Sequence, residues 1–228
     1  MTSEVPVSFS ADGITSPLKG IRRAAARHMI SAWEAPSFQL SVEVDMTLAA
    51  AVKTAVPTAT VTDVIVRSCA EALAAHPSVN AWYSDMSVTA VSSVNVGVAV
   101  ATPAGLTVPV IHAANELSLD QVASRRRDVV ERARTGSLAR ADITGGTFTV
   151  SNLGMLDIDH FGAILNVPQV AILAVGSTRQ RYVWNGGQPE WRPTAVLTLT
   201  CDHRAIDGVE GAAFLGTVKN LVQLVPFI

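Results

Sequence analysis

One stretch near the end of the chain, residues 197–209, constrains the fold more than any other. Leucine and cysteine alternate with threonine and aspartate up to residue 202, which is the pattern of a strand with one buried face. The alternation stops at His203, and Asp207 and Gly208 lead into an apolar segment of helical periodicity. A histidine at a strand end is held rigidly while its ring stays accessible, which suits a general base. Asp207 is close enough to orient or ionically support this region.

Composition narrows the class of protein. The 228 residues are 49% hydrophobic and 16% charged, which favours one domain with a large core. A net charge of −2 favours neither nucleic acid nor a membrane as a partner. Cys69 and Cys201 lie in apolar segments and suggest no disulfide, no apolar run is long enough to span a bilayer, and residues 1–12 lack the pattern of a signal peptide. We therefore expect a cytoplasmic protein.

Periodicity predicts strands and helices in irregular alternation. Helices are predicted over residues 21–33, 49–55, 62–75, 118–136 and 209–225, and strands over residues 38–46, 94–100, 106–111, 147–151, 170–175 and 197–202. Asn185 and Gly186 indicate a hairpin. This order favours an α/β fold in which a mixed β-sheet packs against helices. Residues 1–16 are expected to form a flexible arm, and residues 17–228 the folded domain.

Two polar groups outside the opening stretch are candidate sites. Ser151 ends a predicted strand, where its hydroxyl either satisfies a turn or donates to a developing oxyanion. Asp157, Asp159 and His160 are spaced like metal ligands, but they share one loop and no partner ligand pair occurs elsewhere. We expect them to be solvated and predict no metal site.

The string Asp-His-Arg-Ala-Ile-Asp-Gly at residues 202–208 decides between two interpretations of His203. A lone histidine would be taken as a strand cap, with Arg204 and Asp207 forming an ion pair. The string resembles the signature D-H-R-x-x-D-G of the dihydrolipoamide acyltransferases, the core subunits of 2-oxoacid dehydrogenase complexes such as pyruvate dehydrogenase. Chloramphenicol acetyltransferase shares a shorter version. Further stretches similar to that catalytic domain follow in the same order, at residues 16–29, 42–47, 98–106, 146–154 and 164–172.

The resemblance implies a fold and a role for each matched residue. The fold would be a two-layer sandwich like that of chloramphenicol acetyltransferase, assembled as a homotrimer with active sites between subunits. His203 would be the general base that deprotonates a thiol for attack on an acyl thioester, and Ser151 would hydrogen-bond the oxyanion across the subunit interface. Asp207 would have a mainly structural role, paired with an arginine such as Arg22. A free thiol has a pKa of about 8.5, so a base is needed at neutral pH.

The substrates implied are coenzyme A and a dihydrolipoyl group. The three lysines, Lys19, Lys53 and Lys219, do not lie in the Asp-Lys-Ala turn that carries lipoate in the family, so the lipoyl group is expected on a separate carrier protein. Arg179 is a candidate contact for coenzyme A. The basic run at residues 125–127 is another, although a solvated helix face is the favoured interpretation of it.

Both ends of the chain differ from the family pattern. No lipoyl or peripheral-subunit-binding domain precedes the catalytic region, and only two residues follow Pro226. Larger family cores dock through a longer apolar tail, so we expect an isolated trimer, with a larger assembly as the alternative. The chain is expected to be either an excised core or a free-standing acyltransferase. Three functions remain open: acyl transfer between dihydrolipoamide and coenzyme A alongside 2-oxoacid dehydrogenase components, acyl transfer to a small-molecule hydroxyl or amine, and a non-catalytic scaffold. The presence of both His203 and Ser151 favours an enzyme.

Overall fold

The computed structural model describes residues 17–226, so the arm predicted over residues 1–16 lies outside the described residues, as do residues 227–228. A mixed sheet in the order β1-β11-β9-β8-β4-β7, with β10 paired to β11, forms one layer. Its strands are β1 (Ser37–Asp45), β4 (Val96–Val98), β7 (Val110–Ile111), β8 (Phe148–Asn152), β9 (Ala171–Val175), β10 (Arg179–Asn185) and β11 (Gln188–Asp202). Strands β4, β8 and β9 are parallel and the other pairs antiparallel, which confirms the mixed sheet.

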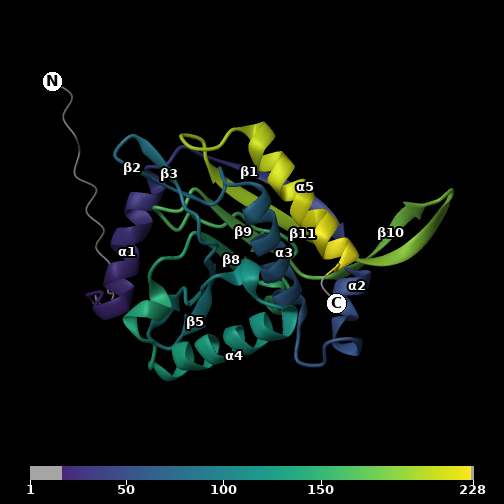
Figure 1. The fold of residues 1–228 in the computed structure, drawn as a ribbon, viewed down its shortest axis with the longest axis horizontal. Helices are drawn as coiled ribbons and strands as arrows, with labels where there is room; N and C mark the ends of the chain where they lie inside the picture. The colour runs from purple at the N-terminus through teal and green to yellow at the C-terminus, as the bar shows by residue number, and fades with distance from the viewer. Residues whose placement is uncertain (1–16, 227–228) are drawn as a thin grey trace, which may run out of the picture.

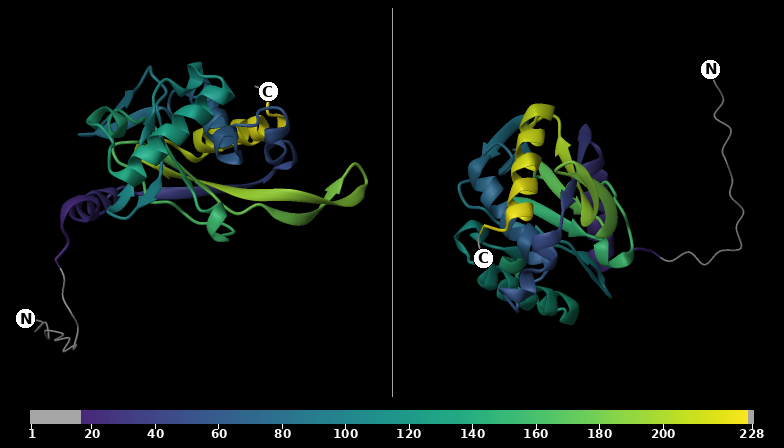
Figure 2. Two further views of the ribbon diagram at one scale, coloured as in Figure 1. Left: turned by 90° about the horizontal axis from the view of Figure 1, so that it is seen from below. Right: turned by 90° about the vertical axis from the view of Figure 1, so that its right-hand side faces the viewer.

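Helices lie against the sheet. They are α1 (Gly20–Trp33), α2 (Thr47–Ala50), α3 (Val61–Ala75), α4 (Leu119–Thr135) and α5 (Gly208–Leu224), with short 3-10 turns at Val52–Thr54, Ala114–Glu116, Arg140–Ile143 and Gly154–Leu156. Most of them form a second layer on one face, and α1 lies at the opposite face, beside Thr149 and Ser151. Helices α3 and α5 cover one face of the sheet, and α4 packs beside α3 (Figure 1). Helix α1 and the β10–β11 hairpin lie at opposite ends of the molecule (Figure 2). None of the helices in residues 17–226 is both long and apolar enough to cross a bilayer.

Two small hairpins complete the fold. They are β2 (Ala81–Ser84) with β3 (Ser87–Ala90), and β5 (Val100–Thr102) with β6 (Gly105–Thr107). The strand predicted over residues 94–100 is thus divided between β4 and β5. The division occurs because β4 pairs with β7 and β8 in the main sheet, whereas β5 pairs with β6 in a separate hairpin. The chain leaves one strand partner for another at this point.

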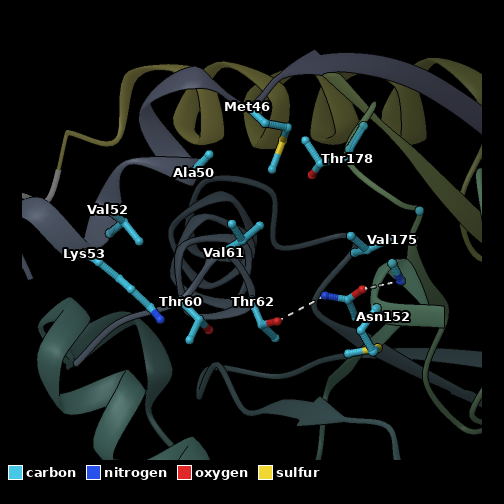
Figure 3. A pocket seen from close by; sticks show the side chains of 14 residues that line it. Met46, Ala50, Val52, Lys53, Thr60, Val61, Thr62, Asn152, Val175 and Thr178 are labelled. Atoms are coloured by element: carbon cyan, nitrogen blue, oxygen red, sulfur yellow. Dashed lines mark hydrogen bonds between the residues drawn. The ribbon is translucent and has the colours of Figure 1, made fainter. Parts of the chain in front are cut away.

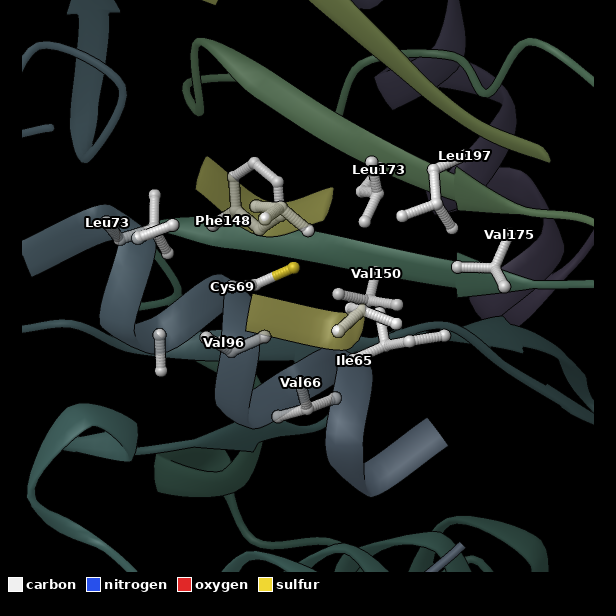
Figure 4. Close-up of a cluster of buried hydrophobic side chains, with 14 of the residues drawn as sticks. Ile65, Val66, Cys69, Leu73, Val96, Phe148, Val150, Leu173, Val175 and Leu197 are labelled. Carbon is white, nitrogen blue, oxygen red and sulfur yellow. The ribbon is translucent and has the colours of Figure 1, made fainter. Parts of the chain in front are cut away.

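The core lies between α3, α5 and the sheet (Figure 4). Side chains from four strands, including Phe148, Val150, Leu173 and Leu197, meet Cys69 of α3, and all five are fully buried. Complete burial of each large apolar side chain contributes roughly 1.5–3 kcal/mol. Because side chains alternate along a strand, burial of Phe148 and Val150 directs Thr149 and Ser151 to the opposite face of the sheet.

Helix ends follow their capping residues. Helix α4 begins after Ser118, which forms a capping box with Gln121, and ends at Gly136 in the left-handed conformation, as predicted. The N-cap of helix α3 is Thr60, two residues before Thr62, which the sequence suggests as the N-cap of this helix. The Asp63 carboxylate accepts from the Thr60 N–H and hydroxyl and so fixes this start.

Close packing of α5 holds the strand that precedes His203. A side-chain carbon at Gly211 would lie 3.0 Å from Leu40 and 3.3 Å from the sulfur of Cys201. Glycine therefore lets α5 approach β1 and β11 closely. The hairpin predicted at Asn185 and Gly186 is confirmed, with Gly186 and Gly187 both at positive φ. It extends β11 back to Gln188, well before the predicted start of that strand.

Candidate active site

His203 directly follows β11 and presents an exposed imidazole. Its backbone N–H donates to the carbonyl of Pro36 at 2.9 Å, and its ring packs against Phe38 with 4.7 Å between ring centroids. Within residues 17–226 no side chain or carbonyl bonds either ring nitrogen. The backbone and one ring face are thus fixed, while both nitrogens are available to a substrate.

Asp202 and Arg204, the neighbours of His203, form hydrogen bonds with each other rather than with the His203 ring. The Asp202 carboxylate is 1% exposed and accepts from the backbone N–H and the guanidinium of Arg204. This hydrogen bonding raises the pKa of Arg204, whose guanidinium also lies 3.9 Å from the centre of the Tyr83 ring. The alternative ion pair of Arg204 with Asp207 is wrong, because Asp202 is the partner. His203 is held between two anchored residues.

Asp207 caps the helix that follows the site. Its carboxylate accepts from the N–H groups of Val209 and Glu210 at 2.8 and 2.9 Å, and its own N–H donates to the Glu210 carboxylate. The predicted pairing with Arg22 is not found within this chain, because these amides occupy the carboxylate and Arg22 lies against Gly105 of the β5–β6 hairpin. Asp207 stabilises the start of α5.

Replacing Asp207 with alanine is expected to lower the free energy of unfolding by about 1 kcal/mol, since two first-turn amides lose their acceptor. Asp207→Asn keeps a capping oxygen and should remain within a few tenths of a kcal/mol of the native protein. Chemical denaturation of both variants checks this. Equal losses in the two variants would contradict the capping role.

Cys201 lies two residues before His203, where a cysteine–histidine pair would be a candidate nucleophile. The thiol is buried in the core, and burial raises its pKa to about 12. Burial also raises the pKa of Cys69. Both cysteines are free and remain protonated at neutral pH, so neither supplies the thiolate that thioester chemistry needs.

Ser151 presents an unengaged hydroxyl to two cavities. It lies on β8 opposite Ala174 of β9, and no group in the described part of the chain hydrogen-bonds its side chain. One cavity, of about 340 Å³, is lined by Arg126 and Leu106 and is called the Arg126 cavity. The other, of about 260 Å³, is lined by Met29, Leu106 and further apolar side chains and is called the Met29 cavity. A ligand in either cavity can accept from Ser151.

Strand register separates Ser151 from His203 within one protomer. Ser151 lies opposite Ala174, and Ala174 lies opposite Thr198, five residues before His203. At about 3.3 Å per residue and 4.8 Å between strands, the two Cα atoms are roughly 19 Å apart. One protomer therefore does not bring this serine and this histidine to the same reacting atom.

A third cavity, of about 440 Å³, adjoins the Arg126 cavity and is called the Lys53 cavity (Figure 3). The two share Thr62, Asn152 and Met155, and Asn152 donates to the Thr62 hydroxyl at 3.0 Å. Lys53 forms no ion pair with any described residue. Sequence reasoning missed it as a site residue because one lysine in an alanine-rich segment carries no signal.

Arg179 forms ion pairs with Asp157 and Asp159, each at 2.7 Å. The pairing lowers the pKa of Asp159 and raises that of Arg179. Among residues 17–226, no group of three histidine, cysteine or acidic side chains is arranged to hold a metal ion. The charge of Arg179, predicted to contact coenzyme A, is already balanced by these carboxylates.

The basic run at residues 125–127 is only partly solvated. Arg126 pairs with Asp63, which is fully buried in α3, and the shorter of its two contacts is 2.5 Å. The prediction of a solvated face balanced by neighbouring acids is therefore wrong for Arg126.

Comparisons with known proteins agree with this geometry. The family described as 2-oxoacid dehydrogenases acyltransferase (catalytic domain) matches residues 10–226. The dihydrolipoyllysine-residue acetyltransferase component of the acetoin cleaving system of Bacillus subtilis is 35% identical over 217 residues, which are 91% of this chain and 54% of that protein. The chain thus spans about half the length of this relative.

Solved structures share the whole fold. A probable dihydrolipoamide acetyltransferase from Listeria monocytogenes has a TM-score of 0.90 at 31% identity, covering 95% of this chain and 97% of that one. The dihydrolipoamide acetyltransferase of Azotobacter vinelandii has a TM-score of 0.88 at 28% identity, covering 99% and 98%. That structure comes from an investigation of a serine, a histidine and an asparagine in its catalytic mechanism, and their spacing matches that of Ser151, His203 and Asp207.

Chloramphenicol acetyltransferase has the same fold at a greater distance. Its TM-score is 0.58 at 13% identity, covering 86% of this chain and 94% of that one. The predicted two-layer fold of this type is therefore confirmed. On the family match and the two closer structures, the chain belongs to the 2-oxoacid dehydrogenase acyltransferases and carries their catalytic domain.

Proposed function

We propose that this protein transfers acyl groups between dihydrolipoamide and coenzyme A. The observation that carries the proposal is that the chain presents both a fixed histidine, His203, with two free ring nitrogens and a serine, Ser151, whose hydroxyl is free at a cavity. In the Azotobacter enzyme, a serine and a histidine at the same spacing were investigated for their part in catalysis. These two side chains supply the two functions that thioester exchange requires, a base and an oxyanion donor.

In the proposed mechanism His203 removes the proton from the attacking thiol. The thiolate sulfur then adds to the thioester carbonyl, and the new oxyanion accepts a hydrogen bond from the Ser151 hydroxyl. When the tetrahedral intermediate collapses, the carbon–sulfur bond of the original thioester breaks. The departing sulfur takes the proton back from His203. Because one thioester replaces another, the same residues catalyse both directions.

The proposed active site joins two protomers of a homotrimer. The separation of about 19 Å between Ser151 and His203 within one chain requires the serine of one subunit to meet the histidine of the next. One related structure is the cubic core of a pyruvate dehydrogenase complex. We propose a trimer as the smallest active unit, with the lipoyl group on a carrier domain and 2-oxoacid dehydrogenase components as partners in the cytoplasm.

Coenzyme A is proposed to enter through the Lys53 cavity. Its phosphates are anionic, and Lys53 offers a charge that no described carboxylate neutralises, unlike Arg179. The Lys53 and Arg126 cavities share three residues, so a ligand held at Lys53 can extend toward Ser151. Asp207 keeps its structural role at the start of α5.

The proposed reaction is tested with acetyl-coenzyme A as donor and dihydrolipoamide as acceptor. A matched acceptor carries hydroxyls in place of the two thiols. We expect the rate of acyl transfer to the dithiol to be at least about a hundredfold higher than the rate to the diol. His203 can remove the proton of a thiol more readily than that of an alcohol. Faster transfer to the diol, or to a small-molecule amine, would identify the other type of acyltransferase. Failure to transfer to any acceptor would favour the scaffold.

A further inference from the structure

Helix α1 forms one wall of the Met29 cavity beside Ser151. Met29 of α1 faces Ile172 of the sheet and Ile164 of the neighbouring loop across this space, and Val108 and Phe161 extend the apolar lining. The cavity also contains Ser151, so an acyl group whose carbonyl oxygen bonds that serine has an apolar space beside it. The position of Met29 sets the width of this space.

Within its own chain, helix α1 is held by few contacts. Ala32 is its one buried residue, and its N-cap, Lys19, makes no side-chain capping bond. Ile30 and Trp33 are largely exposed. Among the described residues, one side-chain hydrogen bond joins α1 to the rest of the chain, between Nε2 of His28 and Oδ1 of Asn166 at 2.9 Å. Met29 is the next residue.

This hydrogen bond continues into the sheet beneath Ser151. The Thr149 hydroxyl has one proton, which it donates to Oε1 of Gln169 at 2.6 Å. Its contact with Nδ2 of Asn166 at 3.1 Å is therefore one in which the hydroxyl oxygen accepts. Oδ1 of Asn166 is therefore the acceptor for His28, and Nε2 of His28 carries the proton. Thr149 is fully buried and lies two residues before Ser151 on the same face of β8. Two consecutive hydrogen bonds thus connect His28 of α1, through Asn166, to Thr149 of β8, the strand that carries Ser151.

We propose that His28 is a positioning residue that sets the size of the acyl group this enzyme accepts. Through Asn166 and Thr149 it ties α1 to β8, and so it holds Met29 against the space beside Ser151. This inference rests on the proposed acyl transfer, because the effect on acyl-group size can be observed only if the protein transfers acyl groups. Loss of the hydrogen bond between His28 and Asn166 lets α1 move away from the sheet, and the Met29 cavity then accepts bulkier acyl groups.

Two variants of His28 separate the hydrogen bond from the volume of the side chain. His28→Gln keeps an N–H donor for Asn166, whereas His28→Leu keeps bulk without a donor. In the assembled protein, kcat/KM is measured with acetyl-coenzyme A and isobutyryl-coenzyme A. His28→Leu is expected to shift the ratio of the two values toward isobutyryl by about tenfold, because one or two methylenes in a fixed apolar pocket account for that much discrimination. His28→Gln should restore the native ratio.

His76 provides the matched control. Its Nε2 also makes one side-chain hydrogen bond, to Thr217 at 2.8 Å, but between α3 and α5 in the helical layer. His76→Leu is expected to leave the acetyl-to-isobutyryl ratio unchanged even if it reduces stability. An equal fall in activity with both donors in His28→Leu, leaving the ratio native, would overturn the proposal.

Hydrogen exchange of the α1 amides tests the bond without any acyl donor. Exchange over residues 20–33 of the assembled protein should be at least about tenfold faster in His28→Leu than in the native protein or His28→Gln. Unchanged exchange in His28→Leu would overturn the positioning role. If the native protein transferred no acyl group at all, the proposed function would fail, and this measurement would still decide whether His28 holds the helix.

Discussion

Replacing His203 with alanine is expected to lower kcat for acyl transfer by about 10²–10⁴-fold, the range that a positioned general base contributes. The exposed ring makes one aromatic contact, with Phe38, so the free energy of unfolding should change little. Steady-state kinetics with acetyl-coenzyme A and dihydrolipoamide measure the loss. His160→Ala, at another exposed histidine, is the control and should retain native activity.

The pH dependence of this variant identifies the role of the ring. A dihydrolipoamide thiol ionises without help as the pH rises through about 8.5, so the deficit of His203→Ala should narrow above that pH. A deficit that stays constant from pH 7 to pH 10 would argue that His203 does something other than remove the thiol proton.

Replacing Ser151 with alanine is expected to lower kcat by about 10²–10³-fold, as the loss of one oxyanion donor does in acyl transfer. The KM for coenzyme A should stay close to native, because the bond forms to the oxyanion rather than to the bound substrate. The Ser151 side chain bonds no described residue, so the fold should be unaffected. A rise in KM with unchanged kcat would instead make Ser151 a substrate-binding residue.

Co-assembly of the two inactive chains separates a shared site from one within a single chain. If each site joins His203 of one subunit to Ser151 of the next, random trimers of His203→Ala and Ser151→Ala chains combine intact residues at about a quarter of their sites. Co-expressed chains should therefore recover about a quarter of the native rate. Activity no higher than that of either variant alone would place the whole site within one chain.

Local elements were predictable because local signals specify them. The capping box at Ser118 and the glycine at Gly136 marked both ends of α4, and Asn185 with Gly186 marked the hairpin. The strand before His203 was visible in its alternation, although its full length was not, because residues 188–194 pair with β10. The mixed sheet followed from the irregular order of strands and helices.

Contacts between distant segments were not predictable in the same way. No local pattern shows that Arg126 reaches Asp63 on another helix, or that Arg179 meets two aspartates across a loop. Lys53 comes to line a cavity, and His28 comes to bond Asn166, only when segments far apart in sequence come together. The candidate base and oxyanion donor were found because their motifs are short and contiguous, whereas the surrounding cavities arise from the tertiary fold.

The pairing of β1 with β11 has a consequence for how this protein is made. The first strand pairs along its whole length with the last, from Ser37 opposite Asp202 to Asp45 opposite Thr194. β11 is also the antiparallel neighbour of β9, so both β1 and β9 lack this partner until β11 has been synthesised. Pairings between such distant segments form slowly, and unpaired strand edges attract other chains. Folding of the sheet therefore cannot finish until β11, the strand that delivers His203, has been synthesised.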